Sequence, residues 1–320
     1  MMLRKKLLKL WLGGMLICCA LMPGVHADEH AMRIGANIWP GNEPLYLAKE
    51  NQYFNANEIR IIDFLSAIEV IRAFRNNSLD AATLTLDEAL KLIASKIPIE
   101  VIIVMDISDG ADAIIAQADY STFTDLKGKR IGVESNALGA YMLTRALNIN
   151  QMQLNEIHPV HLPISDQESR FLHREVDAVV TFEPTRTRLL NQGAHQLFSS
   201  KEIPNEIVDV IVVRKSFASA NPDKVRQLTN GWFKGLDFFN SQPQQASHLI
   251  SKRLKIQPEE VLASYNGLQI PSLEKNYQLL RGNNPLLLPA LSRLRDSLLQ
   301  EHLIDQFIPT TGIVNGNYLP

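Results

Sequence analysis

The sequence predicts an α/β fold of two lobes of similar design, each built on a doubly wound, mostly parallel sheet. Short apolar runs alternate with amphipathic helical patterns from Met32 to Gly193, which is typical of parallel strands joined by helices. One strand-to-helix corner occurs twice, since Asp-Ala before a short β-type run recurs 97 residues apart, at Asp80 and Asp177. From Asn221 onward the pattern is helical, which predicts a helical C-terminal region on the first lobe.

The first series of elements is expected to begin the first lobe. Apolar and β-branched runs predict strands, and apolar residues at helical spacing predict the helices between them. The expected strands are residues 32–39, 58–64, 80–85, 99–107 and 111–117, and the expected helices are residues 42–54, 67–76 and 86–96.

The second series repeats this alternation and predicts the second lobe. The expected strands are residues 129–134, 156–162 and 177–182, and the expected helices are residues 140–149, 165–176 and 183–193. Gly193 stands where a helix is expected to stop. A further buried strand is expected at residues 208–217.

The C-terminal third is expected to be helical as far as His302. Helix breaks are expected at Pro243, Pro258 and Pro271, because proline cannot continue a helix from the preceding turn. The end of the chain is rich in glycine, asparagine and proline and is expected to be a loop.

The N-terminus has the pattern of a signal peptide, residues 1–27, that is cleaved on export. A start with four basic residues precedes the apolar run LWLGGMLICCALM, and VHA before Asp28 fits the cleavage rule. The run is shorter than the roughly 20 residues of a membrane anchor. No small residue precedes Cys18 as a lipobox requires, so no lipid anchor is expected. The predicted location is the periplasm.

The charge and cysteine content of the remaining chain exclude some partners. Without residues 1–27 the chain has 28 basic and 34 acidic side chains and no cysteine. This acidic balance argues against nucleic acid and anionic membranes as partners. A monomer without disulfides is expected, since a chain of this size can bury an adequate core.

Five motifs, in order, carry a resemblance to a known family. They are IGANIWPGNEPLYLAKENQYF, DAATLTLDEAL, VMDISDGADAIIA, DLKGKRIGVESNALGAYMLTRAL and DAVVTFEP. Together they resemble the periplasmic substrate-binding proteins of ABC importers, in the nitrate, sulfonate and taurine-type family that also includes thiamine-precursor binders. The likeness runs from Met32 to Arg281.

The resemblance implies a type II periplasmic binding protein fold with two strands crossing a hinge, here ADAIIAQ and VDVIVV. Lobe one would be residues 28–115 and 208–320, and lobe two residues 116–207. The implied function is a receptor that captures a small polar organic molecule by hinge closure and delivers it to an ABC permease. The resemblance implies no catalytic residue, metal or cofactor. A partner role in membrane signalling is the alternative.

Six candidate ligand contacts belong to the first lobe, where strand ends meet helix starts. They are Trp39, Asn42, Glu43, Ser66, Thr83 and Thr85. Structural roles stay open for several: Trp39 as packing between lobes, Asn42 and Ser66 as helix N-caps, and Thr85 as the cap of the helix that follows.

The other six candidates stand next to the hinge crossing or belong to the second lobe. They are Ser108, Asp112, Ser135, Asn136, Thr181 and Glu183. Ser135 and Asn136 precede a helix whose first N–H groups would suit an acceptor-rich ligand. Glu183 is also favoured at a helix start by the helix dipole, so a purely structural role stays open.

The charges at these corners bear on the ligand. Glu43, Asp106, Asp112, Glu134 and Glu183 stand there, and no lysine or arginine does. Carboxylates would repel a buried anion, so the sequence favours a neutral or cationic organic ligand, with a flat ring over the indole as one option.

Sequence motifs of catalysis are missing. The mature chain has no cysteine, no G-x-S-x-G, no H-E-x-x-H and no Walker loop. His158 and His161 stand three apart on an expected strand and so point to opposite faces, which makes them a poor metal pair. An enzyme acting on a small heterocycle is kept as the less favoured alternative.

Overall fold

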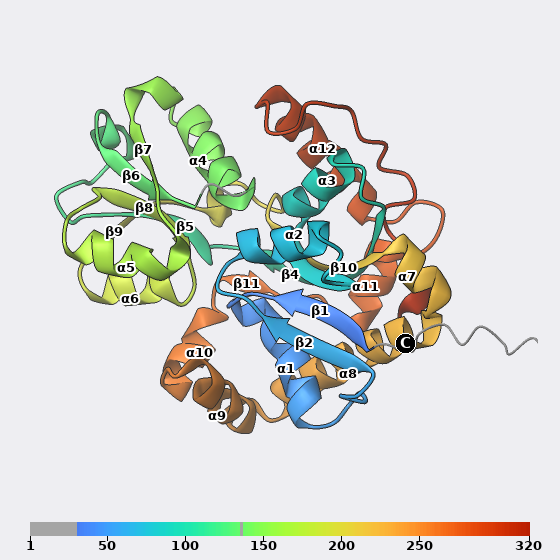
Figure 1. Cartoon of the computed structure of the whole chain (residues 1–320). Helices are drawn as coiled ribbons and strands as arrows, with labels where there is room; N and C mark the ends of the chain where they lie inside the picture. The colour runs from blue at the N-terminus through green and yellow to red at the C-terminus, as the bar shows by residue number, and fades with distance from the viewer. Residues whose placement is uncertain (1–30, 135–136) are drawn as a thin grey trace, which may run out of the picture. The chain divides into compact units, whose positions relative to one another are not determined.

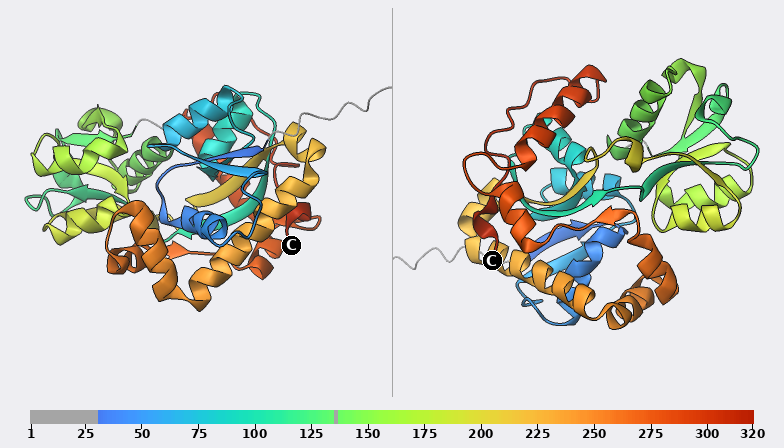
Figure 2. Two further views of the ribbon diagram at one scale, coloured as in Figure 1. Left: turned by 60° about the horizontal axis from the view of Figure 1, so that its bottom comes forward. Right: turned by 180° about the vertical axis from the view of Figure 1, so that it is seen from behind.

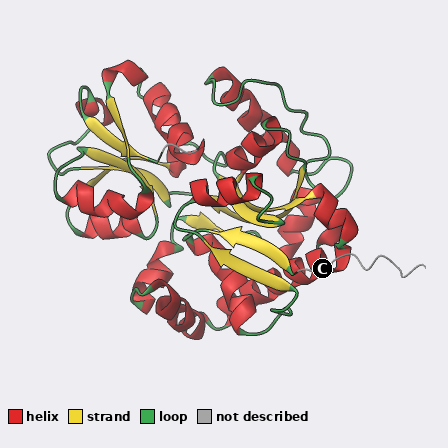
Figure 3. Cartoon of the chain, viewed as in Figure 1, coloured by secondary structure: helices red, strands yellow, loops and turns green. Residues whose placement is uncertain are grey.

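The computed structural model describes residues 31–134 and 137–320, which form one compact unit from Met32 with two separate sheets (Figure 1, Figure 3). The predicted signal peptide and the candidates Ser135 and Asn136 lie outside the described residues. The α/β prediction and the expectation of two sheets are confirmed.

The first sheet has the strand order β11-β4-β10-β3-β1-β2, and the second has the order β7-β6-β8-β5-β9. The strands of the first sheet are β1 (Met32–Ala36), β2 (Ile59–Asp63), β3 (Ala81–Thr85), β4 (Ile99–Ser108), β10 (Val208–Arg214) and β11 (Leu268–Gln269). Those of the second are β5 (Asp112–Ala116), β6 (Arg130–Val133), β7 (His158–His161), β8 (Ala178–Phe182) and β9 (His195–Ser199).

Helices join and cover these strands. The α-helices are α1 (Glu43–Glu50), α2 (Ala67–Arg75), α3 (Leu86–Ala94), α4 (Ala137–Ile149), α5 (Ile164–Leu172), α6 (Thr185–Asn191), α7 (Lys215–Ala220), α8 (Pro222–Ser241), α9 (Pro243–Leu254), α10 (Pro258–Ser264), α11 (Leu273–Leu280) and α12 (Leu287–Gln300). Short 3-10 turns are η1 (Pro40–Asn42), η2 (Phe123–Leu126), η3 (Leu154–Glu156), η4 (Ser200–Glu202) and η5 (Gly316–Tyr318). Pro243 and Pro258 each start a new helix, as expected from their missing N–H groups.

Helices lie on both faces of the first sheet. Figures 1 and 2 show α2, α3 and α12 on one side and α1, α8 and α9 on the other. One continuous apolar core links the sheet to α1, α2, α3, α8 and α12, and Trp232 of α8 is among its fully buried side chains. The buried side chains of α9 belong to a smaller cluster with Leu47 and Phe238. No helix in the described part of the chain is long and apolar enough to cross a membrane.

Both sheets are mixed, and most strands of each run in one direction, as the prediction of mostly parallel sheets requires. In the first sheet β10 runs antiparallel to both β3 and β4, and in the second β5 runs antiparallel to β8 and β9. Each of these two strands enters its sheet directly after the chain has crossed from the other sheet, so it runs against its neighbours. Each also takes the same place in the strand order, beside the third strand of its series.

The chain passes between the sheets twice, at residues 109–111 and 203–207. The strands ADAIIAQ and VDVIVV, expected to make the crossings, each lie in one sheet instead. The crossings are tied together, because the Ser108 N–H donates to the Ile207 carbonyl at 3.0 Å and the Ser108 and Ser200 hydroxyls are 2.8 Å apart. Gly110 has φ +114°, a backbone conformation that favours glycine.

The repeated Asp-Ala corner is a structural clamp at the amino ends of the strands. Asp80 accepts from the backbone N–H and the guanidinium of Arg33 on β1, at 2.9 and 3.0 Å. Asp177 accepts from the same two groups of Arg130 on β6, at 2.8 and 3.1 Å. Both arginines open an Arg-Ile-Gly sequence 97 residues apart. The same ion pair therefore joins β1 to the start of β3 in the first sheet and β6 to the start of β8 in the second.

Two strands were not expected from the sequence. β9 is exposed over its first residues and has no long apolar run, and β11 contains only Leu268 and Gln269. Beyond the short β11, the Asn276 side chain of α11 satisfies backbone groups of β4. Its amide oxygen accepts from the Val104 N–H at 2.8 Å, and its amide nitrogen donates to the Val104 carbonyl at 3.0 Å.

Candidate ligand-binding site

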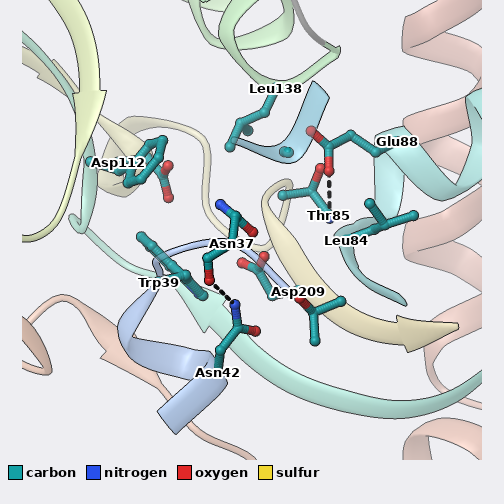
Figure 4. Close-up of a pocket in the computed structure, with 12 residues that line it drawn as sticks. Asn37, Trp39, Asn42, Leu84, Thr85, Glu88, Asp112, Leu138 and Asp209 are labelled. Atoms are coloured by element: carbon teal, nitrogen blue, oxygen red, sulfur yellow. Dashed lines mark hydrogen bonds between the residues drawn. The ribbon is translucent and has the colours of Figure 1, made fainter. Parts of the chain in front are cut away.

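A pocket lies where the carboxyl ends of β1 and β3 face elements of the second sheet (Figure 4). It holds about 400 Å³ of empty space, part of it open to solvent. The first sheet and its helices contribute Asn37, Trp39, Asn42, Ala67, Thr83, Leu84, Thr85, Glu88 and Asp209, and the second contributes Asp112, Leu138 and Phe182. This is the edge where sheets of this class bind ligands.

A second pocket adjoins the first and lies within the second sheet's half. It is lined by Asp112, Glu134, Leu138, Gly139, Met142, Gln167, Val180, Thr181 and Phe182. The two pockets share Asp112, Leu138 and Phe182. We treat them together as the candidate site, since a ligand in the first pocket can reach into the second past these three side chains.

Strand register explains how three polar groups come to lie in a row. Asp209 of β10 stands directly opposite Thr85 on β3 and opposite Asp106 on β4. Directly opposed residues of antiparallel strands point to the same face of the sheet. The Asp106 and Asp209 carboxyls therefore lie side by side on one face of the sheet, close enough for each charge to act on the other.

Two aspartates occupy equivalent places in the two sheets. Asp209 on β10 pairs with Thr85, the last residue of β3, and Asp112 on β5 pairs with Phe182, the last residue of β8. Thr85 and Phe182 are 97 residues apart, the interval of the repeated clamp. We call β5 and β10 the exchanged strands, because each enters its sheet directly after the chain has crossed from the other sheet. Each half of the molecule thus supplies one aspartate from its exchanged strand to the same pocket.

Asp106 fixes the loop that carries Trp39. The indole Nε1 donates to Asp106 Oδ2 at 3.0 Å, and the Trp39 ring meets the Phe182 ring edge to face with centroids 5.6 Å apart. Gly41 allows this approach, because a Cβ at that position would lie 1.8 Å from Asp106 Oδ2. Trp39 therefore forms a wall of the pocket and a contact between the two halves.

Burial raises the pKa values of the carboxyls around the pocket. It raises the pKa of Asp112 to about 7 and that of Asp106 to about 7, the latter against the hydrogen bond from the Trp39 indole. Burial and the neighbouring Asp87 raise the pKa of Glu88 to about 8. Burial, followed by the charges of Asp106 and Asp112, raises the pKa of Asp209 well above its usual value.

Several buried polar atoms at the site have no partner within the protein. They are Asn42 Oδ1, Thr83 Oγ1, Thr85 Oγ1, Glu88 Oε1, Asp112 Oδ2, Gln167 Oε1, Thr181 Oγ1 and Asp209 Oδ2. Buried polar groups are satisfied in most proteins, so a group of such atoms around one pocket indicates that a ligand supplies the missing bonds. All eight can accept a hydrogen bond.

Six of the predicted site residues line these pockets. Trp39, Asn42, Thr83, Thr85 and Asp112 line the first, and Thr181 lines the second with Asp112. Asn42 stands at the N-cap position of α1, but its amide donates to the Asn37 carbonyl at 2.9 Å and makes no cap bond.

Glu43 and Glu183 line neither pocket, because each is paired with an arginine. Glu43 is fully buried and holds the guanidinium of Arg253 on α9 through both carboxylate oxygens. Glu183 accepts from Arg186 at 2.8 Å and from the Thr187 N–H at 3.1 Å, at the start of α6. These two carboxylates stabilise the corners that carry the site.

Ser66 and Ser108 also lie outside both lining sets. The Ser66 hydroxyl accepts from the Glu69 N–H at 3.4 Å and caps α2, the alternative left open by the sequence. Ser108 accepts from the Asp112 N–H at 3.2 Å and contacts Ser200, so it belongs to the crossing between the sheets.

Sequence reasoning missed other lining residues. Asp209 had a signal, since it is an isolated acid in the apolar run VDVIVV, where a buried strand was expected. Glu88 lies in the first turn of α3, where the helix dipole alone would explain an acid; one oxygen accepts from the Thr85 N–H at 3.1 Å, and the other has no partner. Gln167 and Leu138 gave no signal, because their sequence neighbours fit ordinary helices.

Within the described residues, no group of three or more histidine, cysteine, aspartate or glutamate side chains converges closely enough to hold a metal ion. The carboxyls at the site are distributed around the pocket walls rather than directed at one point. This geometry suits an extended ligand better than a bare ion.

Comparisons with known proteins agree with this architecture. The model of the NMT1-like family matches residues 26–254. A protein of Brucella abortus (strain 2308) named as a binding protein is 26% identical over 154 residues, or 46% of this chain and 47% of that relative, so the match spans about half of that relative's length. A protein of Escherichia coli (strain K12) named as an aliphatic sulfonates-binding protein is 21% identical over 267 residues, which cover 82% of this chain and 83% of that relative.

A solved structure shares the fold. The alkanesulfonate-binding protein SsuA from Xanthomonas axonopodis pv. citri, bound to MOPS, superimposes with a TM-score of 0.72 at 17% identity, covering 92% of this chain and 99% of that one. The predicted type II periplasmic binding protein fold and the resemblance to the sulfonate-type binding proteins are therefore confirmed. Because the family model covers well over half of the sequence, this chain belongs to the NMT1-like family.

Proposed function

We propose that this protein is the periplasmic solute-binding component of an ABC importer, which captures a small polar organic molecule and delivers it to a membrane permease. The observation that carries the proposal is the convergence of unpartnered buried acceptors from both halves of the molecule on one site. Thr83 belongs to the first sheet and Thr181 to the second, and neither hydroxyl has a partner. A ligand that bonds both would hold the halves together.

The crossings supply a place for the two halves to move. Lobe one would comprise the first sheet with its helices, and lobe two the second sheet, joined through residues 109–111 and 203–207. A two-segment connection of this kind permits hinge closure, in which a few backbone positions such as Gly110 absorb the change. Ligand contacts from both lobes then favour the closed form over the open one.

The site offers little for covalent catalysis. Among the described residues that line either pocket there is no serine, cysteine, lysine or histidine. Carboxyls with raised pKa values can act as general acids, so an enzyme acting on a small heterocycle is the competing function. Incubation of purified protein with each ligand found below, followed by mass spectrometry, should return the ligand unchanged.

Substitution of the two unpartnered threonines tests the capture model. A thermal-shift screen of amines, pyrimidines, sulfonates and oxyanions should first identify a ligand. Thr83→Val and Thr181→Val should each leave the free protein as stable or more stable, since each removes an unsatisfied buried hydroxyl, yet weaken ligand binding. Thr122→Val is the control, because Thr122 is exposed and lines neither pocket.

Scattering measurements should show that the same ligand contracts the wild-type protein. The proposal fails if only one of the two threonines affects binding, since a one-sided site cannot close the molecule. It also fails if a ligand is consumed during incubation.

A further inference from the structure

The ion pairs of Glu43 and Glu183 leave a distinct set of carboxyls without a basic partner at the site. Glu88, Asp112 and Asp209 line the first pocket, and no described lining residue of either pocket is lysine, arginine or histidine. Lys91 acts on Glu88 from the next turn of α3, but it does not line a pocket. The walls therefore hold more potential negative charge than the protein neutralises.

Unpartnered acceptors within the site give a second, independent observation. Asp112 is 2% exposed and Glu88 is 1% exposed, and each directs one carboxylate oxygen with no hydrogen-bond partner into the site. Thr83 and Asn42, both nearly inaccessible, add two more acceptor oxygens. A sulfonate or other anion brings only acceptors, so it would leave the carboxylate and amide oxygens unbonded and place like charges together.

The apolar part of the lining indicates what kind of cation would fit the site. Trp39, Phe182 and Leu138 form walls between the carboxyls, as Figure 4 shows for Trp39, Leu138 and Asp112. The spread of the carboxyls excludes a chelated metal within the described residues. A ligand with an apolar part and a positively charged head that bears N–H groups fits this lining. The apolar part would contact the apolar side chains, the N–H groups would donate to the carboxylates, and the aromatic rings could also face the cation.

We propose that the site selects a small organic cation whose charged head carries N–H donors, such as a primary ammonium, amidinium or guanidinium group, held between Asp112 of one half and Asp209 of the other. This inference rests on the proposed binding function and names its ligand class. Since the two aspartates come from the two exchanged strands, one cation between them would bond both halves at once. Closure and recognition would then depend on the same pair of side chains.

Matched probes separate charge from shape. Benzamidine, benzamide and benzenesulfonate offer a cation, a neutral N–H donor and an anion on one ring, and agmatine, an acyclic dication, extends the series. At pH 8, calorimetry should give dissociation constants at least about tenfold lower for one of the two cations than for benzamide, and no binding of the sulfonate. Asp112→Asn and Asp209→Asn should each weaken cation binding by about 30-fold or more, as loss of one partner of a buried charge pair does.

Asp177→Asn is the matched control, since it removes a carboxylate from the clamp at the opposite strand ends. Its cation affinity should equal that of the wild type. Tight binding of benzenesulfonate with no binding of the cations would overturn the inference while leaving the binding function intact. Equal affinity for benzamidine and benzamide would also overturn it, because charge would then not be recognised. Absence of binding by every probe would count against both proposals.

Discussion

Replacing Asp112 by asparagine should make the ligand-free protein more stable at alkaline pH and leave it little changed at acidic pH. Asp112 is almost fully buried at the start of β5, and one carboxylate oxygen has no partner. Burial raises its pKa from 3.8 to about 7, opposed by the Ser108 hydroxyl and reinforced by the charges of Asp106, Asp87 and Glu183. The amide keeps the shape of the side chain and cannot ionise.

The sign and size follow from proton linkage. A native carboxyl with a raised pKa binds more protons than the unfolded chain between pH 4 and 7, so the free energy of unfolding falls as pH rises through that window. Each unit is worth about 1.4 kcal/mol, so the wild type should lose about 3 kcal/mol relative to Asp112→Asn between pH 5 and 8. Further carboxyls with raised pKa values, among them Glu88, Asp106 and Asp209, titrate in both proteins and make the same pH-dependent contribution to the stability of each.

Urea denaturation at pH 5, 6, 7 and 8 measures this difference directly. The curves of wild type and Asp112→Asn should diverge steadily with pH. Asp177→Asn is the control with the opposite expectation, because the hydrogen bonds from Arg130 outweigh burial and lower the pKa of Asp177. Its loss should lower stability by a constant amount over this range. Parallel curves for wild type and Asp112→Asn would show that Asp112 is ionised and solvated in the native protein, which would refute the burial argument.

Three further outcomes are expected. Affinity for benzamidine should rise from pH 5 to pH 8, because Asp112 and the paired Asp106 and Asp209 must lose protons to attract a cation; calorimetry that finds constant affinity would contradict this. Gly41→Ala should abolish binding in the same titration, since its Cβ would displace Asp106, whereas the fold should survive with a lower melting temperature. Asn276→Ala should lower the free energy of unfolding in urea by about 2–4 kcal/mol, because it leaves the buried backbone of Val104 without partners; a loss below about 1 kcal/mol would mean that water replaces the amide.

Most elements could be predicted from the sequence because local pattern determines them. Strands such as Ala81–Thr85 are buried along their whole length, and their sequences contain only apolar residues and threonine, without a charged side chain. Strand direction could not be predicted in the same way. β10 is as apolar as a parallel strand, and it is antiparallel only because the chain returns from the other sheet before entering it.

The sequence could predict which residues stand at the strand ends near the candidate site, but not which of them form ion pairs with distant residues. Glu43 and Asp112 are both acids next to the end or the start of a strand, and both were predicted as ligand contacts on that ground alone. Arg253, which neutralises Glu43, is 210 residues away on α9. Nothing local to either acid indicates whether a distant helix will bring an arginine to it, so the free and paired carboxylates could only be separated by the fold.

The repeat that first indicated two similar halves marks the end of each sheet opposite to the site. Asp80 and Asp177 hold the amino ends of β3 and β8, and these five-residue strands extend roughly 17 Å to the pocket at their carboxyl ends. The clamps are alike because both halves need the same strand arrangement. The pocket also receives one aspartate per half, Asp112 and Asp209, yet these stand on the exchanged strands, outside the repeated sequence. Sequence similarity between the halves therefore reflects the shared scaffold, and the proposed ligand specificity depends on β5 and β10, the two strands that each follow a crossing between the sheets.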